Sequence, residues 1–214
     1  MTKAPTDGNS PIETSGPSAE HLAKSAESAA NKTRSKGLPP VHLWHPPFSG
    51  DMDMRITCDG QWVHEGRPIT RDGLVRLFAS ILRYDDGSDG GETGYMLVTP
   101  AERFRIQVDD VPFVAEAVDI TGDGRDQTLT FTTNLGDVTT AGPDAPLRVV
   151  LDPETGEPTP YVRVRGGLDA RIDRKSFYHL IDRATHEDHD GGRWFGLWSA
   201  GRFFPIIPSD ALEE

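Results

Sequence analysis

The chain has 214 residues, of which 36% are hydrophobic and 26% are charged, and this composition is typical of a globular protein. Its formal net charge of -12 argues against a nucleic-acid partner, because such binding depends on neutralising phosphates with basic side chains. The only cysteine, Cys58, excludes an intramolecular disulfide, so we expect a reducing, cytoplasmic setting. No apolar run is long enough for a membrane span and no secretory signal is visible, so we expect no membrane partner.

The first 37 residues have the composition of a tail. Ser, Ala, Gly, Pro, Lys and Glu dominate residues 1–37, and such segments bury too little apolar surface to fold alone. We therefore expect a disordered or loosely helical tail, with one short, loosely docked helix over residues 18–33. From Gly37 the sequence GLPPVHLWHPPFSGDMDMRI is proline-punctuated and apolar, and we expect it to lie extended over the body of the protein.

A unit of strands and one helix follows. Alternating residues at 53–58 and 61–64 predict a hairpin around Asp59-Gly60. The segment ITRDGLVRLFASILR, from Ile69 to Arg83, has apolar residues at helical spacing, which predicts an amphipathic helix capped by Thr70. After a polar loop at 85–94, residues 95–99 and 103–108 predict two further strands.

The same pattern returns in the second half of the chain. The apolar positions of a helix predicted at 173–184 lie 103 residues after those of the first, and the following strand positions lie 100 residues after theirs. The difference falls in a loop, where a duplicated unit tolerates a change of length. Residues 109–160, between the copies, predict strands at 111–120, 127–134, 137–140 and 147–151. We therefore predict an α+β protein of two β-rich antiparallel domains, residues 38–107 and 108–214, with a duplicated strand–turn–strand–helix–strand–strand core.

Familiar catalytic and metal-binding motifs are not recognisable. The sequence has no G-x-S-x-G elbow and no phosphate-binding glycine loop, and the DITGDGRD loop has Thr130 where a calcium loop needs glutamate. The histidines and acids at 186–189 fall in an expected polar loop after the second helix, which is a poor frame for a metal. We therefore expect no cofactor and no metal, and we favour a binding protein over an enzyme.

One candidate ligand site lies at the start of the first domain. Asp51, Asp53 and Arg55 alternate along an extended segment, so their side chains fall on one face. Such a row would hold a ligand with hydroxyl or amine groups. The alternative is a salt-bridged sheet edge.

The other candidate lies in the second domain, at the small polar residues 132–144. Glycines there allow backbone amides to approach a ligand closely, and nearby arginines would bind a phosphate with paired hydrogen bonds. The alternative is a pair of tight turns with the arginines in ordinary ion pairs. The candidate residues are Asn134, Asp137, Gly142, Arg148, Arg163 and Arg165.

Several long segments resemble one known family. LPPVHLWHPPFSGDMDMRI, DGQWVHEGRPITR, LVRLFASILR, YMLVTPAERFRI, TFTTNLGDVTTAGPDAPLRV and PYVRVRGGLDARIDR, from about Leu38 to about Pro208, are similar to the bacterial domain-of-unknown-function 1285 family. The resemblance implies two domains with a duplicated core, the C-terminal one superficially similar to pleckstrin-homology-like barrels. It also implies a nucleotide-like ligand at the domain interface and a signalling role, and it supplies no catalytic residues.

Three functions are compatible with these observations. The leading hypothesis is a regulatory protein that binds a small anionic ligand between its two domains. A second is a protein-interaction module that uses the proline-rich segment (residues 39–48), with Trp44 and Phe48 as anchors. A third is a novel enzyme in which Asp51 and Asp53 act as acid and base, which requires a raised pKa for one of them.

Overall fold

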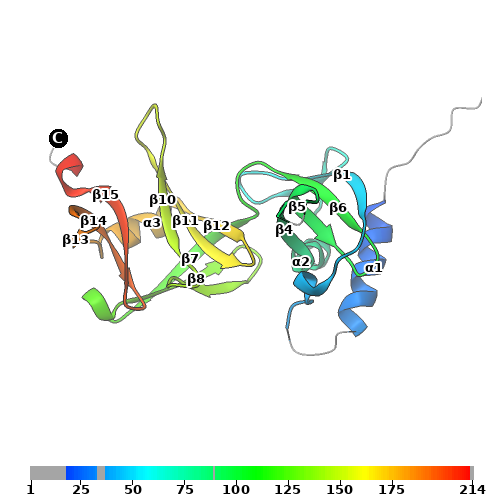
Figure 1. Cartoon of the computed structure of the whole chain (residues 1–214), viewed down its shortest axis with the longest axis horizontal. Helices are drawn as coiled ribbons and strands as arrows, with labels where there is room; N and C mark the ends of the chain where they lie inside the picture. The colour runs from blue at the N-terminus through cyan, green and yellow to red at the C-terminus, as the bar shows by residue number, and fades with distance from the viewer. Residues whose placement is uncertain (1–17, 33–36, 89, 213–214) are drawn as a thin grey trace, which may run out of the picture.

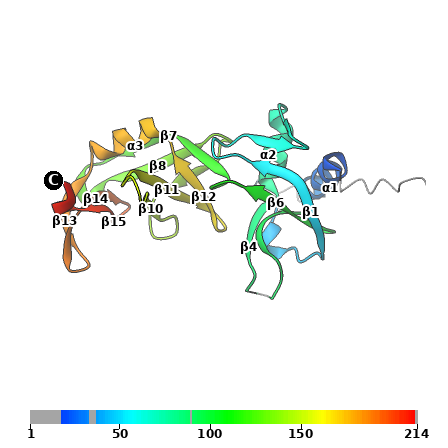
Figure 2. The same ribbon diagram turned by 90° about the horizontal axis from the view of Figure 1, so that it is seen from above.

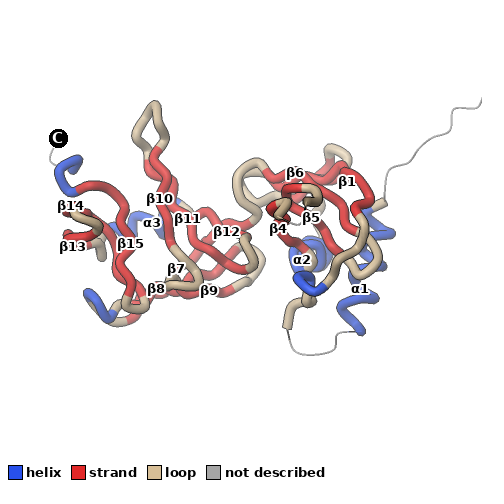
Figure 3. The backbone as a smooth tube through the Cα atoms, viewed as in Figure 1, coloured by secondary structure: helices blue, strands red, loops and turns tan. Residues whose placement is uncertain are grey.

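The computed structural model describes residues 18–32, 37–88 and 90–212, and this part of the chain forms three β-sheets and three α-helices. Figures 1 and 3 show two strand-rich bodies side by side along the long axis of the molecule, joined where β6 leads into β7. The predicted architecture of two β-rich α+β domains is confirmed.

The N-terminal domain is built on a six-stranded sheet with the order β3-β2-β1-β6-β5-β4. On β1, Met52, Met54 and Ile56 are buried and alternate with exposed residues, as expected of a strand with one covered face. β1 and β6 run parallel, so the expectation of antiparallel pairing throughout was wrong. The chain between them includes a helix, which is the connection that a parallel pair needs. The strands are β1 (Phe48–Ile56), β2 (Trp62–His64), β3 (Arg67–Pro68), β4 (Leu82–Asp86), β5 (Thr93–Val98) and β6 (Arg103–Val108).

The helix of this domain, α2 (Asp72–Ser80), is shorter than predicted. Arg71 occupies the N-cap position and makes no side-chain cap, so the predicted capping role of Thr70 was wrong. The helix ends early because Ile81 accepts a backbone hydrogen bond from Val98, and the next residue begins β4. Of the predicted apolar stripe, Ile81 is therefore the C-cap of the helix and Leu82 belongs to a strand.

A further helix, α1 (Ala19–Lys32), packs against α2 (Figure 2). Leu22 and Ala26 are fully buried in the hydrophobic core, so the expected helix is present and is docked more firmly than its composition suggested. Residues 1–17 and 33–36, the rest of the expected tail, lie outside the described residues. Of the helices in the described ranges, none is both long and apolar enough to cross a membrane.

The C-terminal domain combines a six-stranded sheet, of order β10-β11-β12-β7-β8-β9, with a three-stranded sheet, β13-β14-β15. β12 and β7 are its parallel pair. Its helix α3 (Arg174–Ile181) packs against β7 and β14, and Asp173 caps it by accepting a hydrogen bond from the backbone N–H of Ser176. The strands are β7 (Phe113–Thr121), β8 (Thr128–Thr133), β9 (Val138–Thr140), β10 (Leu147–Leu151), β11 (Pro158–Arg165), β12 (Leu168–Ile172), β13 (Thr185–His189), β14 (Gly192–Ser199) and β15 (Arg202–Pro208). Short 3-10 helices lie at Val41–Leu43, Gly124–Asp126 and Ser209–Leu212.

The two halves share the order of their elements and differ in how the strands pair. Apart from β3, which has no counterpart among the described strands, β1, β2, α2 and β4 to β6 come in the same order as β11, β12, α3 and β13 to β15. However, β1 pairs with β6, whereas β11 pairs with β10 and β12. The polar loop expected at residues 186–189 is in fact β13, because its backbone pairs with β14.

The docking of α1 can be tested by truncating its buried leucine. We expect Leu22→Ala to lower the free energy of unfolding by about 2–4 kcal/mol, because it empties a fully buried site. Leu43→Ala is the control, since Leu43 is 65% exposed and its loss should change stability by less than about 0.5 kcal/mol. Urea denaturation measures both values, and equal effects would show that α1 is not docked in solution.

Candidate functional site

The boundary between the two domains is held by arginines that donate to backbone carbonyls of the other domain. Arg165 Nη2 donates to the carbonyl of Ala79 at 2.8 Å, and Arg171 Nη2 donates to that of Cys58 at 2.7 Å. In the opposite direction, Arg76 Nη1 donates to the carbonyl of Leu135 at 3.2 Å. Carbonyls in turns and in the last turn of a helix lack partners in their own element, so a guanidinium satisfies them well.

Arg165 is the most enclosed of these arginines. Its guanidinium lies 4.9 Å from the centre of the Phe113 ring and 3.2 Å from Oδ2 of Asp137. Burial lowers the pKa of the Arg165 guanidinium, and the charge of Asp137 opposes this shift. The donated bond to Ala79 reaches the last turn of α2, where a positive charge is also favoured by the helix dipole.

A cavity of about 440 Å³ opens at this boundary. β4 is an edge strand, so residues on both of its faces reach the cavity, and the turn between β11 and β12 forms the opposite wall. Each domain contributes one guanidinium to the wall, Arg83 and Arg165. The remaining lining residues are Leu38, Pro39, Pro40, Val41, His42, Ser80, Leu82, Tyr84, Gly166 and Leu168.

The proline-rich segment forms part of this wall because Arg83 anchors it. Arg83 Nη1 donates to the carbonyls of Val41 at 2.8 Å and of Trp44 at 2.7 Å, and the same guanidinium binds Asp85 through Nε and Nη2. Trp44 is half-buried against the hydrophobic core, and Phe48 lies under the guanidinium of Arg105. The two aromatic side chains of the segment thus contact the chain's own body.

Beyond Tyr84, a set of tyrosines and arginines continues the domain boundary; we call it the Tyr–Arg cluster. Tyr84 and Tyr95 face each other across β4 and β5 with their ring centres 5.1 Å apart. A side chain at Gly167, in the β11–β12 turn, would touch Tyr84 at 3.6 Å, so the turn packs directly on this ring. The cluster consists of Tyr84, Tyr95, Arg148, Tyr161, Arg163 and Asp169.

The arginines of the cluster share one carboxylate. Arg148 Nη2 lies 3.1 Å from Asp169 Oδ2 and its guanidinium stacks 4.1 Å from the Tyr161 ring centre, while Arg163 binds the other oxygen. The carboxylate is 12% exposed, and the two arginines are 47% and 37% exposed. The guanidinium groups of the cluster are therefore accessible to solvent, whereas its carboxylate is largely buried. Burial raises the pKa of Tyr95, and the charge of Asp169 adds to this, so the hydroxyl stays protonated.

The side chains of the first predicted patch lie on one face of a strand, as expected, but they pair with residues that were not predicted as partners. Asp51, Asp53 and Arg55 are all exposed on one face of β1, as predicted. β1 is an interior strand, so the patch is not a sheet edge. Asp51 pairs with Arg105 at 2.6 Å, and this hydrogen bond lowers the pKa of Asp51, which is opposite to the shift that an acid/base role requires. Arg55 forms two hydrogen bonds to Asp109.

The second predicted patch is brought together only in part. Arg165 pairs with Asp137, whereas Arg148 and Arg163 turn to Asp169. Gly142 is buried, and its backbone N–H donates to the carbonyl of Ala145 in a turn. The predicted convergence of three arginines on residues 132–144 is therefore limited to one.

Asn134 of that patch lies at the domain boundary. Its Oδ1 accepts a hydrogen bond from the backbone N–H of Val114 at 3.2 Å. Gly60, in the hairpin turn of the other domain, has a φ of 81°, and a Cβ there would lie 2.7 Å from Asn134 Nδ2. The turn can approach this closely because it has glycine at that position.

The tyrosines, Arg83 and Asp169 were not predicted as site residues. The residue pattern places Leu82–Asp86 at the end of a helix and in a loop, so it does not predict that Tyr84 and Tyr95 face each other across two strands. Alternation in LRYDD was the signal that pointed to a strand.

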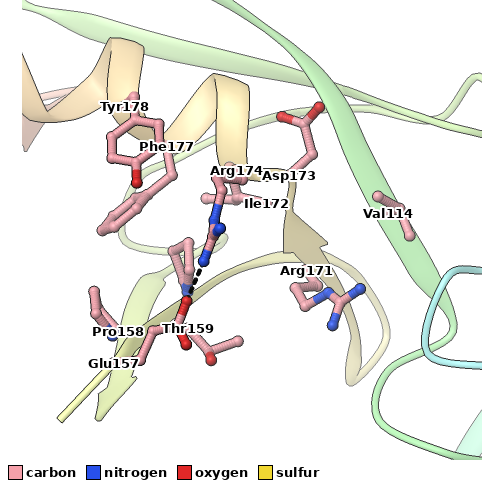
Figure 4. A pocket seen from close by; sticks show the side chains of 11 residues that line it. Val114, Glu157, Pro158, Thr159, Arg171, Ile172, Asp173, Arg174, Phe177 and Tyr178 are labelled. Carbon is pink, nitrogen blue, oxygen red and sulfur yellow. Dashed lines mark hydrogen bonds and ion pairs between the residues drawn. The ribbon is translucent and has the colours of Figure 1, made fainter. Parts of the chain in front are cut away.

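A separate cavity of about 410 Å³ lies within the C-terminal domain, between α3 and the first residues of β11 (Figure 4). The ion pair between Arg174 and Glu157 spans it, and Phe177 and Tyr178 line the side formed by α3. It contains none of the predicted site residues. Across the described ranges, no three His, Cys, Asp or Glu side chains are grouped so that they could hold a metal ion.

Comparison with known proteins identifies relatives. A family model described as "Domain of unknown function (DUF1285), N-terminal domain" matches residues 39–111, and one described as "Protein of unknown function (DUF1285), C-terminal domain" matches residues 112–206. The crystal structure of a DUF1285 family protein from Silicibacter pomeroyi DSS-3 is 53% identical, with a TM-score of 0.76 over 90% of this chain and 98% of that one. Another, from Shewanella baltica OS155, is 23% identical, with a TM-score of 0.46 over 62% of this chain and 92% of that one. No curated protein matches significantly.

The role of Arg165 at the boundary can be tested by removing its charge. We expect Arg165→Met to lower the free energy of unfolding by about 2–4 kcal/mol, because Asp137 and the Ala79 carbonyl lose their partner in a half-buried site. Arg125→Met is the matched control, since Arg125 also pairs with a carboxylate and lies over a ring but is 71% exposed. Its loss should cost less than about 1 kcal/mol, and an equal cost would contradict the assignment.

The Arg55–Asp109 pair should make the free energy of unfolding depend on pH in the acidic range. The hydrogen bond from Arg55 lowers the pKa of Asp109, so this stabilisation is present above the unfolded value of about 3.9 and is lost as the pH falls through the folded pKa. In denaturation at several pH values, Asp109→Asn should be less stable than the wild type at pH 7, and the difference should shrink below about pH 4. Exposed Asp144→Asn serves as control, and a difference that is constant with pH would refute the pairing.

Proposed function

The chain belongs to the DUF1285 family of proteins of unknown function, and from its domain interface we propose that it binds a small anionic, nucleotide-like ligand there and has a regulatory role. The observation that carries this proposal is the interdomain cavity, whose wall holds one guanidinium from each domain. Its volume of about 440 Å³ lies in the range of about 300–1,000 Å³ typical of small-ligand sites.

The lining chemistry suits a ligand with an anionic group and an apolar or planar body. Prolines and aliphatic residues make up half of the lining residues, and Arg83 and Arg165 supply positive charge. Arginine is less strongly hydrated than lysine and binds carboxylate or phosphate through paired donors, so it suits a partly enclosed anion site. The site is therefore compatible with the otherwise acidic chain.

The Tyr–Arg cluster extends the same surface for a longer ligand. Tyr84 lines the cavity and also belongs to the cluster, so a ligand leaving the cavity would pass over its ring. Arg148 and Arg163 lie beyond it with exposed guanidinium groups. Planar rings and guanidinium planes are the groups on which nucleobases stack.

The position of the cavity supports the proposal of a regulatory role. Any ligand in it touches β4 and the proline-rich segment of one domain and the β11–β12 turn of the other. A ligand that contacts both domains favours the arrangement in which both walls are present. Binding would therefore stabilise one relative position of the domains, which is the property a ligand-controlled switch needs.

Tyr84 gives the sharpest test, because it is shared by the cavity and the cluster. We expect at least one member of a panel of nucleoside mono-, di- and cyclic phosphates and simple carboxylates to bind in isothermal titration calorimetry. Tyr84→Ala should weaken that binding at least about fivefold, since aromatic contacts to a ligand contribute about 1–3 kcal/mol. Tyr84 is 39% exposed, so the fold should tolerate the change.

Tyr178→Ala is the matched control, because Tyr178 is 62% exposed and lines the separate cavity in the C-terminal domain. It should leave the affinity unchanged. If no anion of the panel binds, or if both tyrosine variants bind as well as the wild type, the proposal fails.

A further inference from the structure

The charges around the interdomain cavity are not balanced. Arg83 Nε lies 2.5 Å from Asp85 Oδ1, and Arg103 Nη1 lies 3.0 Å from Asp85 Oδ2, so two arginines share one carboxylate. These side chains are only 12–14% exposed. Arg83 and Arg165 line the cavity, whereas their partners Arg103, Asp85 and Asp137 do not. Together the three guanidinium groups are paired with two carboxylates, which leaves one positive charge. An enclosed charge without a counter-ion is costly, so a single negative charge in the cavity would be favoured.

The arginines of the wall have few hydrogen-bond donors left for a ligand. A guanidinium has five N–H groups, and Arg83 already makes four hydrogen bonds, to Asp85, Val41 and Trp44. Arg165 donates to Ala79 through Nη2, whereas its buried Nη1 lies 3.2 Å from Asp137 Oδ2 without a hydrogen-bond partner among the described residues, so this donor remains for a ligand. A phosphate monoester carries three strong acceptor oxygens and about two negative charges, and it would leave most of these unsatisfied here. A carboxylate needs fewer donors and brings one charge.

The rest of the wall offers apolar contact. Leu82 and Leu168 line the cavity and are buried, and Pro39, Pro40 and Val41 line it and are half-buried. Prolines have no backbone N–H, so this side of the cavity provides few polar groups to orient a sugar or a phosphate. A ligand gains here by burying hydrocarbon surface, at roughly 25 cal/mol per Å².

We propose that the interdomain cavity binds a monocarboxylate with an apolar tail or ring, held by the unbalanced positive charge of Arg83, Arg103 and Arg165. This proposal rests on the small-anion binding proposed above, and it assigns a carboxylate to the site in place of the phosphate of a nucleotide-like ligand. The carboxylate lies on the side of the arginines, and the hydrocarbon part lies between the proline-rich segment and the β11–β12 turn.

Three eight-carbon probes separate the contributions of charge and of hydrocarbon. Octanoate, octanol and octyl phosphate share the tail and carry one, no and about two negative charges at pH 7.5. By isothermal titration calorimetry of the full chain, octanoate should bind at least tenfold more tightly than either of the others. Equal affinity for octanol and octanoate would mean that hydrocarbon burial alone drives binding, and tighter binding of octyl phosphate would mean a dianion site; either result overturns the proposal.

The position of bound octanoate can be tested by placing a negative charge at the edge of the cavity. His42 is exposed and lines the cavity, whereas His45, three residues later in the same segment, is exposed and does not line it. His42→Glu should weaken octanoate about threefold to tenfold by repulsion, and His45→Glu should leave it within about twofold of the wild type. Equal effects of the two variants would place octanoate outside the cavity.

Adenosine monophosphate distinguishes failure of this inference from failure of the function. If it binds in a Tyr84-dependent way and octanoate does not bind, the monocarboxylate assignment is wrong and the anionic-ligand function stands. If neither binds, and no other anion of the panel does, both are wrong.

Discussion

The arrangement of the two domains depends on the enclosed guanidinium of Arg165. Removing an arginine from water is costly, and here three different partners offset that cost: the Asp137 carboxylate, the Phe113 ring and the carbonyl of Ala79. The first two belong to the C-terminal domain and the third to the last turn of α2. Because all three must be satisfied together, the position of α2 relative to the C-terminal domain is specified, and so is the width of the interdomain cavity.

The same type of contact, an arginine that donates to backbone carbonyls, recurs around that cavity. Arg83 anchors the proline-rich segment through two carbonyls, as Arg76 and Arg171 anchor the two domains through one carbonyl each. Any residue type can supply a backbone carbonyl, provided that the backbone has the right conformation. The identity of the accepting residue therefore does not reveal these contacts in the sequence. It follows that the groups which position the walls of the cavity also supply its charge. The same arginines therefore account for the positions of the cavity walls and for the proposed ligand preference.

Much of the local structure could be predicted from residue patterns. The single face shared by Asp51, Asp53 and Arg55 follows from the period of a strand, and the strands of residues 109–160 follow from alternation and turn residues. The length of α2 could not be predicted, because Ile81 and Leu82 suit a helical stripe and a buried strand equally well. Pairing with β5 decides between them, and that pairing joins residues on either side of a loop.

The sequence by itself determined the two-domain, β-rich architecture, the repeated order of its elements and the excess of negative charge, since these depend on spacing and composition. The tertiary structure alone decided which charges meet. Arg148 and Arg163 were expected at a turn and instead share Asp169, and Arg83 meets carbonyls about forty residues away. An arginine on a strand can reach several acids of similar chemistry, and the choice is made by burial and geometry after the sheets have packed. The candidate site, which consists of such choices, is therefore a property of the folded chain.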